Sequence, residues 1–191
     1  MLMWSIPVLK LGDLMNKLHG LRCYLAGPID HADDDGVGWR NRVSLWMAQK
    51  GVHVMDPCNK PTSDSTYKEI DEEKVKMMEL KENRDFDSLT TYMKEIVHVD
   101  LRMLDRSDFV IVYIDMEAKP FGTIWELQNA LHQKKPTLVF VEGGKSKISN
   151  WAYGIMNHNY IFDSMGDLLA YLHGIDTGDT DADLTRWVFF E

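Results

Sequence analysis

The segment from Phe109 to Ile114 restricts the fold of this chain more than any other feature. It reads Phe-Val-Ile-Val-Tyr-Ile and lacks the polar–apolar alternation of a half-exposed strand. An unbroken run of this kind is typical of a parallel strand whose two faces are both covered by helices. We therefore expect an α/β domain built around a parallel sheet.

Strand and helix patterns alternate on both sides of this run. Strands are predicted at 21–26, 52–55, 137–141 and 159–162, and helices at about 39–50, 86–104, 123–134, 149–156 and 164–173. This alternation predicts a flavodoxin-like or Rossmann-like, doubly wound parallel sheet of about five strands, in the order 2-1-3-4-5. In such a sheet, ligands bind beyond the carboxyl ends of strands 1 and 3.

The length of 191 residues is that of a single domain, which we expect to span the whole chain. Residues 59–88 are rich in Lys, Glu and Asp, and they predict an inserted charged helix and loop. This insertion is either a solvated excursion, a lid or an oligomer contact. The tail 174–191 is acidic and ends in the apolar segment 187–190, which we expect to dock on its own subunit or on a neighbour.

Composition argues against several classes of protein. The formal net charge of −9 disfavours binding to a nucleic acid polymer or an anionic membrane. Cys23 and Cys58 belong to no metal-binding or redox motif, and they suit a reducing compartment. With no signal-peptide pattern and no long apolar run, the expected location is the cytoplasm.

Asp100 is the most informative single residue. Helical spacing places it on the apolar stripe that contains Ile96 and Leu104. A carboxylate there is costly unless it is paired or faces a pocket, where burial would raise its pKa. The sequence leaves open a catalytic acid or an ion pair with Arg102 or Arg106.

Glu126 also has two interpretations. The segment Gly122-Thr123-Ile-Trp-Glu126 has the Thr-x-x-Glu spacing of a capping box, in which Glu bonds back to the helix start. Alternatively, Glu126 lies in the first turn of a helix that faces the site, where the helix dipole keeps it ionised as a nucleophile.

The end of the first strand is a further candidate. Gly27-Pro28 is either an ordinary turn or a point where a ligand approaches the backbone. Tyr24 either projects toward the same site or packs in the core. The acidic run 33–35 predicts a solvated loop, and the histidines show no metal-ligand spacing, so no metal is expected.

Together these segments resemble the nucleoside 2-deoxyribosyltransferase family, which includes deoxynucleoside 5'-monophosphate N-glycosidases. The resemblance covers roughly residues 21–172, with 59–88 as an insertion. It rests on the order and spacing of five pieces: Tyr24-Leu-Ala-Gly-Pro-Ile-Asp30, Trp39-Arg40, Asp100-Leu-x-Met-Leu-x-x-Ser-Asp108, Gly122-Thr-x-x-Glu126-Leu-x-x-Ala130 and Lys135-Pro136.

The resemblance implies roles for the candidate residues. Glu126 would be the nucleophile, Asp100 would contact the base and help protonate its departing nitrogen, and Tyr24 would orient Glu126. The chemistry would pass through a covalent glycosyl-Glu ester and need no metal or organic cofactor. The remaining substrate-binding candidates are Gly27, Pro28, Ile29, Asp30, Asp115, Gly122, Thr123, Ser149 and Asn150.

Two departures from the family pattern and one mixed position leave the substrate open. Pro120 stands where transferases often carry an acidic residue, and Asp30 stands where phosphate-binding glycosidases often carry Arg. Ser149 matches the monophosphate branch, whereas Asn150 lies one position from the transferase Asn. We therefore expect a deoxynucleoside transferase, with a monophosphate hydrolase as the alternative. A binding module for nucleotide derivatives is the alternative of another class.

The expected partners are a small nucleoside or nucleotide substrate and further copies of this chain. The family habit of completing each site from a neighbouring subunit implies a homodimer or a larger homo-oligomer with shared sites.

Overall fold

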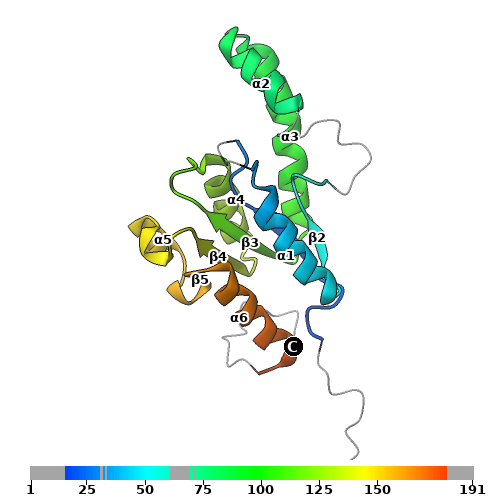
Figure 1. Cartoon of the computed structure of the whole chain (residues 1–191), viewed down its shortest axis with the longest axis vertical. Coiled ribbons are helices and arrows are strands. Elements are labelled where there is room, and N and C mark those ends of the chain that lie inside the picture. The colour runs from blue at the N-terminus through cyan, green and yellow to red at the C-terminus, as the bar shows by residue number, and fades with distance from the viewer. Residues whose placement is uncertain (1–15, 31, 33, 61–68, 71, 180–191) are drawn as a thin grey trace, which may run out of the picture.

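The computed structural model describes residues 16–30, 32, 34–60, 69–70 and 72–179 (Figure 1). Its single five-stranded sheet has the order β2-β1-β3-β4-β5, and every pair of neighbouring strands is parallel. The predicted fold class and strand order are therefore confirmed. The strands are β1 (Arg22–Ala26), β2 (His53–Met55), β3 (Phe109–Ile114), β4 (Thr137–Val141) and β5 (Ile161–Phe162).

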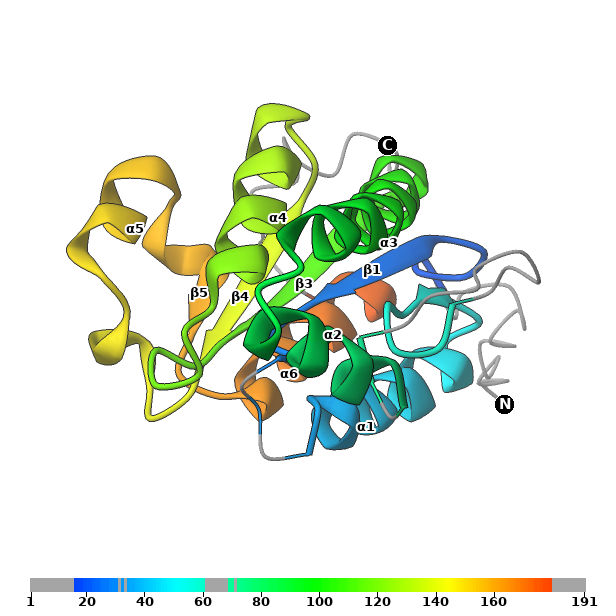
Figure 2. The same ribbon diagram turned by 90° about the horizontal axis from the view of Figure 1, so that it is seen from above.

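The described part of the chain contains six α-helices. They are α1 (Val37–Gln49), α2 (Glu72–Glu82), α3 (Phe86–Arg106), α4 (Phe121–His132), α5 (Asn150–Ile155) and α6 (Met165–Thr177). Helices α3 and α4 cover one face of the sheet, and α1 and α6 cover the other (Figure 2). None of the described helices has the length and apolar character needed to cross a membrane.

The register of the strands decides which side chains meet each layer of helices. Tyr24 lies beside Val110, which lies beside Thr137, and these three side chains share the face covered by α3 and α4. Leu25 and its neighbour Ile111 point to the opposite face. Both sets are buried, so the unbroken apolar run of β3 reflects a strand that is covered on both sides.

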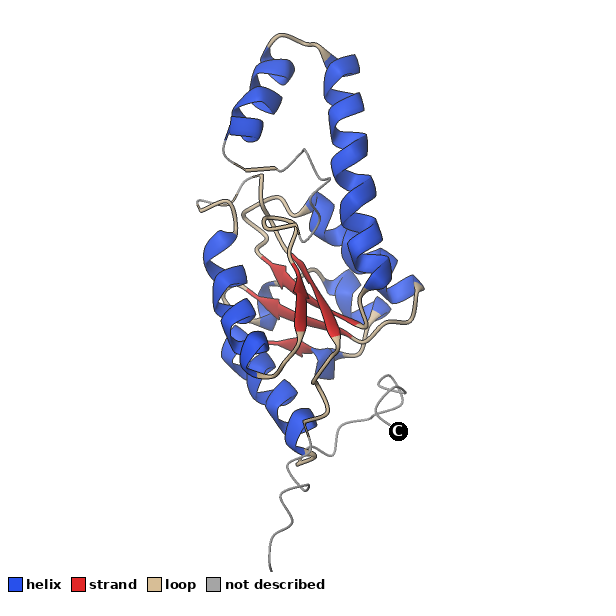
Figure 3. Cartoon of the chain, turned by 90° about the vertical axis from the view of Figure 1, so that its right-hand side faces the viewer, coloured by secondary structure: helices blue, strands red, loops and turns tan. Residues whose placement is uncertain are grey.

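The insertion forms a helical hairpin that projects beyond the carboxyl edge of the sheet (Figure 3). Helix α2 confirms the charged helix predicted within residues 59–88. It packs on the first half of α3 through a small cluster of Met77, Tyr92 and Ile96, separate from the main core. Lys81 also pairs with Asp30 at 3.4 Å, which links the hairpin to the loop after β1.

Two predicted boundaries were wrong. Helix α4 begins at Phe121, two residues before the predicted start. Helix α6 continues to Thr177, because its left-handed cap is Gly178, so the first residues of the predicted tail are helical. The remainder of that tail, including Trp187 to Phe190, and most of segment 1–20 lie outside the described residues.

Arg40 joins the two loops that leave β1 and β2. Its side chain is fully buried, and its guanidinium donates to the carbonyls of Gly27 at 2.7 Å and Gly36 at 2.9 Å. Its Nε lies 3.4 Å from the carboxylate of Asp56, which follows β2. A buried cation with these partners holds both loops in a single arrangement.

Replacing Arg40 with Met should lower the free energy of unfolding by about 3–5 kcal/mol, because it leaves Asp56 buried without its cation. Denaturant titration measures this change. Arg42→Met removes the same charge from an exposed position of α1 and should change stability by less than about 0.5 kcal/mol. Equal effects of the two substitutions would contradict the role given to Arg40.

Candidate active site

Tyr24 and Glu126 meet between β1 and α4. Tyr24 is fully buried, and its hydroxyl donates a hydrogen bond to Oε1 of Glu126. Burial, followed by the negative charges of Glu126 and Asp100, raises the pKa of Tyr24 well above its usual value. Tyr24 therefore keeps its proton and acts as a fixed donor that orients the carboxylate.

Glu126 does not cap its helix. Helix α4 starts at Phe121 after Pro120, without a side-chain cap, so Glu126 lies in the second turn and not in the first. The capping-box interpretation of Thr123 and Glu126 was therefore wrong, as was the placement of Glu126 in the first turn. The carboxylate instead points to Tyr24 on the sheet.

The electrostatic environment of Glu126 also differs from the expectation. The pKa of Glu126 is raised to about 8: burial is the main cause, the hydrogen bond from Tyr24 opposes the rise, and the nearby charge of Asp100 adds to it. The helix dipole was expected to keep this group ionised, but its effect is small so far into the helix. Glu126 is thus poised to change its charge near neutral pH, as expected of a reactive carboxyl group.

Asp100 faces the same site from α3. It is 7% exposed, which confirms that the apolar stripe carries it inward. Its partner is Lys60, with Nζ 2.7 Å from Oδ1, so the alternative of an ion pair with Arg102 or Arg106 was wrong. Burial raises the pKa of Asp100, and the charge of Lys60 opposes this rise.

Glu69 is a third acidic group near this site, and sequence reasoning missed it. The pKa of Glu69 is raised to about 7. Burial is the largest cause, the negative charge of Asp100 is the second, and the positive charge of Lys60 opposes the rise. Lys60 and Glu69 both belong to the insertion, whose weak periodicity gave no sign that either residue is directed inward. Three carboxyl groups, from α3, α4 and the insertion, thus influence one another here.

The loop after β1 forms a wall of the site. A Cβ atom at Gly27 would lie 2.6 Å from Cζ2 of Trp39, so only glycine fits there. The carbonyl of Pro28 lies 3.4 Å from Nη1 of Arg40, and Ile29 is buried. Asp30 is exposed beside Lys81, and this cation offsets its charge.

Other predicted substrate-binding residues lie at the end of β3 and the start of α4. Asp115 accepts a hydrogen bond from the amide of Glu117 at 2.9 Å, so its carboxylate shapes the loop. Thr123 is buried, whereas a Cβ at Gly122 would have no atom within 4 Å. The backbone at Gly122 is therefore open to a ligand.

Ser149 and Asn150 are not brought to the carboxylates. Ser149 caps α5 and accepts from the amide of Trp151 at 3.4 Å, and Asn150 begins this helix. Both are exposed, and α5 lies toward the β4–β5 side of the sheet, away from β1 (Figure 1). Within one chain, these two residues do not contribute to the Tyr24–Glu126 site.

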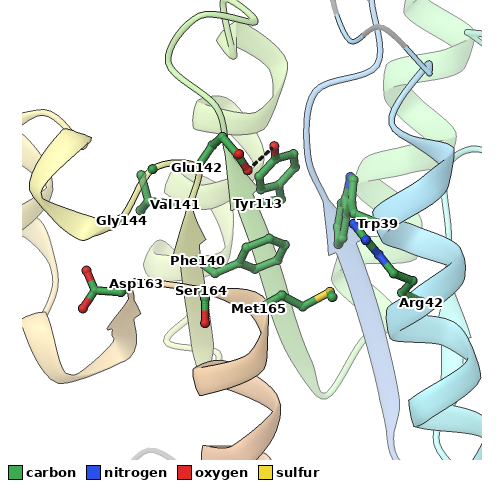
Figure 4. Close-up of a pocket in the computed structure, with 11 residues that line it drawn as sticks. Trp39, Arg42, Tyr113, Phe140, Val141, Glu142, Gly144, Asp163, Ser164 and Met165 are labelled. Carbon is green, nitrogen blue, oxygen red and sulfur yellow. Dashed lines mark hydrogen bonds between the residues drawn. The ribbon is translucent and has the colours of Figure 1, made fainter.

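A cavity of about 540 Å³ opens on the opposite face of the sheet (Figure 4). It contains none of the three predicted catalytic residues, so it is distinct from the carboxylate site. Its wall mixes polar and aromatic side chains, and Tyr113 stacks on Phe140 at a centroid distance of 4.8 Å. The lining residues are Trp39, Arg42, Tyr113, Phe140, Val141, Glu142, Gly143, Gly144, Asp163, Ser164 and Met165.

No group of three His, Cys, Asp or Glu side chains in the described part of the chain is arranged to hold a metal ion. The cation that faces the carboxylates is instead the ammonium group of Lys60.

Comparison with known proteins assigns the chain to a family. Residues 23–166 match the family model described as nucleoside 2-deoxyribosyltransferase, and the chain belongs to that family. The Tyr24–Glu126 pair and Asp100 lie within the matched segment. No curated protein matches the chain significantly.

The solved structures that are similar to this chain include two deoxyribosyltransferases. One is the 2-deoxyribosyltransferase of Bacillus psychrosaccharolyticus, with 16% identity, a TM-score of 0.48, and coverage of 78% of this chain and 91% of that one. The other is the 2-desoxiribosyltransferase of Leishmania mexicana, with 20% identity, a TM-score of 0.47, and coverage of 80% and 96%.

Gly27→Ala should destabilise the protein by about 1–3 kcal/mol, because the new methyl group meets the buried indole of Trp39. Gly122→Ala is the matched control: it adds the same methyl group in open space on a helix and should leave stability unchanged or raise it by up to about 1 kcal/mol. Thermal melting compares the two variants. A stable Gly27→Ala protein would show that Trp39 does not confine this loop.

Proposed function

We propose that this chain cleaves the N-glycosidic bond of a 2'-deoxynucleoside and transfers the deoxyribosyl group to another base. The observation that carries the proposal is the hydrogen bond from Tyr24 to Glu126 with Asp100 close by. The site lies where ligands bind in doubly wound sheets. It presents a nucleophile, a group that orients it and a second carboxyl group.

In the first step, an ionised oxygen of Glu126 attacks C1' of the sugar and forms an ester. The bond between C1' and the base nitrogen breaks, and its electron pair goes to the base. Asp100 protonates the departing base; burial favours the protonated form that this step requires, while the charge of Lys60 opposes it. Tyr24 keeps the attacking oxygen in place throughout.

In the second step, a nitrogen of the acceptor base attacks C1' and displaces the Glu126 carboxylate. The incoming base gives up its proton to Asp100, which returns to its starting state. If water attacks instead, the product is the free sugar and the enzyme acts as a hydrolase. Access of water to the ester thus separates the two activities.

A hydrolase of deoxynucleoside 5'-monophosphates is the second candidate. Asp30 alone would repel a phosphate from the loop after β1. However, Lys81 lies 3.4 Å from Asp30, and Lys74 pairs with Asp35 on the same loop. These lysines bring positive charge to the loop and offset the repulsion, which keeps a monophosphate substrate compatible with the site.

The experiment that tests the function is chromatography of the protein incubated with each deoxynucleoside and each deoxynucleoside monophosphate, with and without a free acceptor base. A new nucleoside that forms only with an acceptor supports the transferase, and free base from a monophosphate supports the hydrolase. The absence of turnover on all of them would favour a non-catalytic binding module.

Glu126→Gln should abolish turnover, with a loss of at least about 10⁴-fold, because the amide keeps the shape of the side chain but cannot form the ester. The melting temperature should change little, since Gln still accepts a hydrogen bond from Tyr24. Initial rates and thermal melting measure the two effects. Glu95→Gln makes the same change at an exposed position of α3 and should keep wild-type activity.

A Glu126→Gln variant that melts far below the wild-type protein but retains its turnover would sink the catalytic assignment. That result would return Glu126 to a purely structural role.

The proposed functional unit is a homo-oligomer. Helix α4 exposes Phe121, at 86%, and Trp125, and helix α5 exposes Trp151, at 82%, and Ile155. Large exposed apolar side chains of this kind mark surfaces that associate. A second copy covering α5 would bring Ser149 and its neighbours to a site other than their own.

Light scattering at micromolar concentration should therefore give the mass of a dimer or a larger assembly. Trp151→Asp should lower that mass and reduce turnover, because it places a charge in the contact. Leu45→Asp is the control, since Leu45 is 69% exposed on α1 and should leave the mass unchanged. A wild-type monomer would contradict the proposed oligomer.

A further inference from the structure

Lys60 and Asp100 form a buried ion pair beside the proposed nucleophile. Nζ of Lys60 lies 2.7 Å from Oδ1 of Asp100, and the two residues are 9% and 7% exposed. Among the described residues, neither atom has a hydrogen-bond partner besides this contact. Buried charges are tolerated only when they are compensated, so each of these groups depends on the other.

The other nearby cation is already engaged. Arg40 donates to the carbonyls of Gly27, Pro28 and Gly36, and its Nε faces Asp56. The charge of Arg40 is therefore largely balanced by Asp56, and its N–H groups bond to loop carbonyls. Lys60 is the cation in direct contact with Asp100.

Several titratable or charged groups surround Asp100, and Lys60 acts on Asp100 alongside them. Glu126 and Tyr24 approach from α4 and β1, and Glu69 approaches from the insertion. The groups with which Asp100 interacts electrostatically are Tyr24, Arg40, Asp56, Cys58, Lys60, Glu69 and Glu126; Asp30 acts on Glu69.

We propose that Lys60 is a positioning residue of the proposed reaction, which holds the Asp100 carboxylate in place and sets the pH range in which Asp100 and Glu126 share one proton. The contact is made to Oδ1 of Asp100. The inference rests on the proposed function, and it assigns to the insertion a direct part in the site.

The direction in which the loss of Lys60 shifts the pH profile follows from the positive charge of its side chain. The proposed reaction needs Glu126 ionised and Asp100 protonated, so the coupled pair carries one proton and activity falls on both sides of that window. A cation beside the pair favours loss of protons. Without Lys60, both apparent pKa values of the pair rise, and the window moves to higher pH.

Lys60→Gln removes the charge and keeps a hydrogen-bond donor. The pH profile of kcat/KM should move to higher pH by about one unit, which is about a tenfold loss at a fixed pH on the acid side. Lys60→Arg keeps the charge and should restore the wild-type position of the profile. Lys94→Met is the control, since it removes a lysine charge from an exposed position of α3 and should shift nothing.

Titration of the side-chain carboxyl carbons of Glu126 and Asp100 by NMR gives a readout that does not require turnover. Both midpoints should move to higher pH in Lys60→Gln. If the protein shows no turnover but these midpoints move, the proposed function fails and the electrostatic role of Lys60 stands. If turnover depends on Glu126 but neither profile nor midpoints move, the inference about Lys60 is overturned.

Thermal melting establishes that each variant is folded. If Lys60→Gln does not fold, the double variant Lys60→Gln/Asp100→Asn leaves no unpaired charge, and it is compared with Asp100→Asn alone. Because Lys60 acts through Asp100, the Glu126 midpoint should then be nearly the same in both proteins. A difference of a full unit between them would show that Lys60 acts directly on Glu126, against the proposal.

Discussion

The geometry of the site depends on the hydrogen bonds and the ion pair made by the buried guanidinium of Arg40. This group satisfies backbone carbonyls that the turn after β1 leaves without partners in the sheet, and it balances Asp56 after β2. Loops at the carboxyl edge of a sheet are otherwise free to vary. Here a single fully buried cation joins two of them, and Gly27 allows the indole of Trp39 to close the arrangement from α1.

The candidate site places a fixed hydrogen-bond donor beside several buried carboxyl groups. Tyr24 is fixed in the sheet and holds Glu126, whereas Glu126, Asp100 and Glu69 all have pKa values raised first by burial. Protonatable groups gathered in this way are stable only with a nearby cation or a shared proton. The carboxyl groups of the site therefore have perturbed pKa values, as expected where a carboxyl group must react near neutral pH.

The insertion contacts both helix α3 and the residues of the candidate site. Helix α2 packs on α3 through its own small apolar cluster, and ion pairs join it to the loop after β1. The residues at its base, Lys60 and Glu69, contribute to the electrostatics of the same site that the sheet builds. The hairpin that projects from the sheet (Figure 3) thus has its base beside the carboxyl groups of the candidate site.

The sequence alone determined the parallel sheet, and it predicted Tyr24, Asp100 and Glu126 as candidate site residues, which the structure places near one another. The unbroken run of β3 required cover on both faces, and helical spacing placed Asp100 inward, because apolar periodicity records burial directly. The role of Glu126 was open from the residues, because Thr-x-x-Glu is also a helix cap, and only the start of α4 at Phe121 decided that it is not. Tertiary structure alone brought Lys60 to Asp100, since the two are 40 positions apart and the segment between them shows no periodicity that predicts contact. It alone also set the pKa of Glu126 near 8, because that value depends on burial and on neighbouring charges that no linear pattern contains.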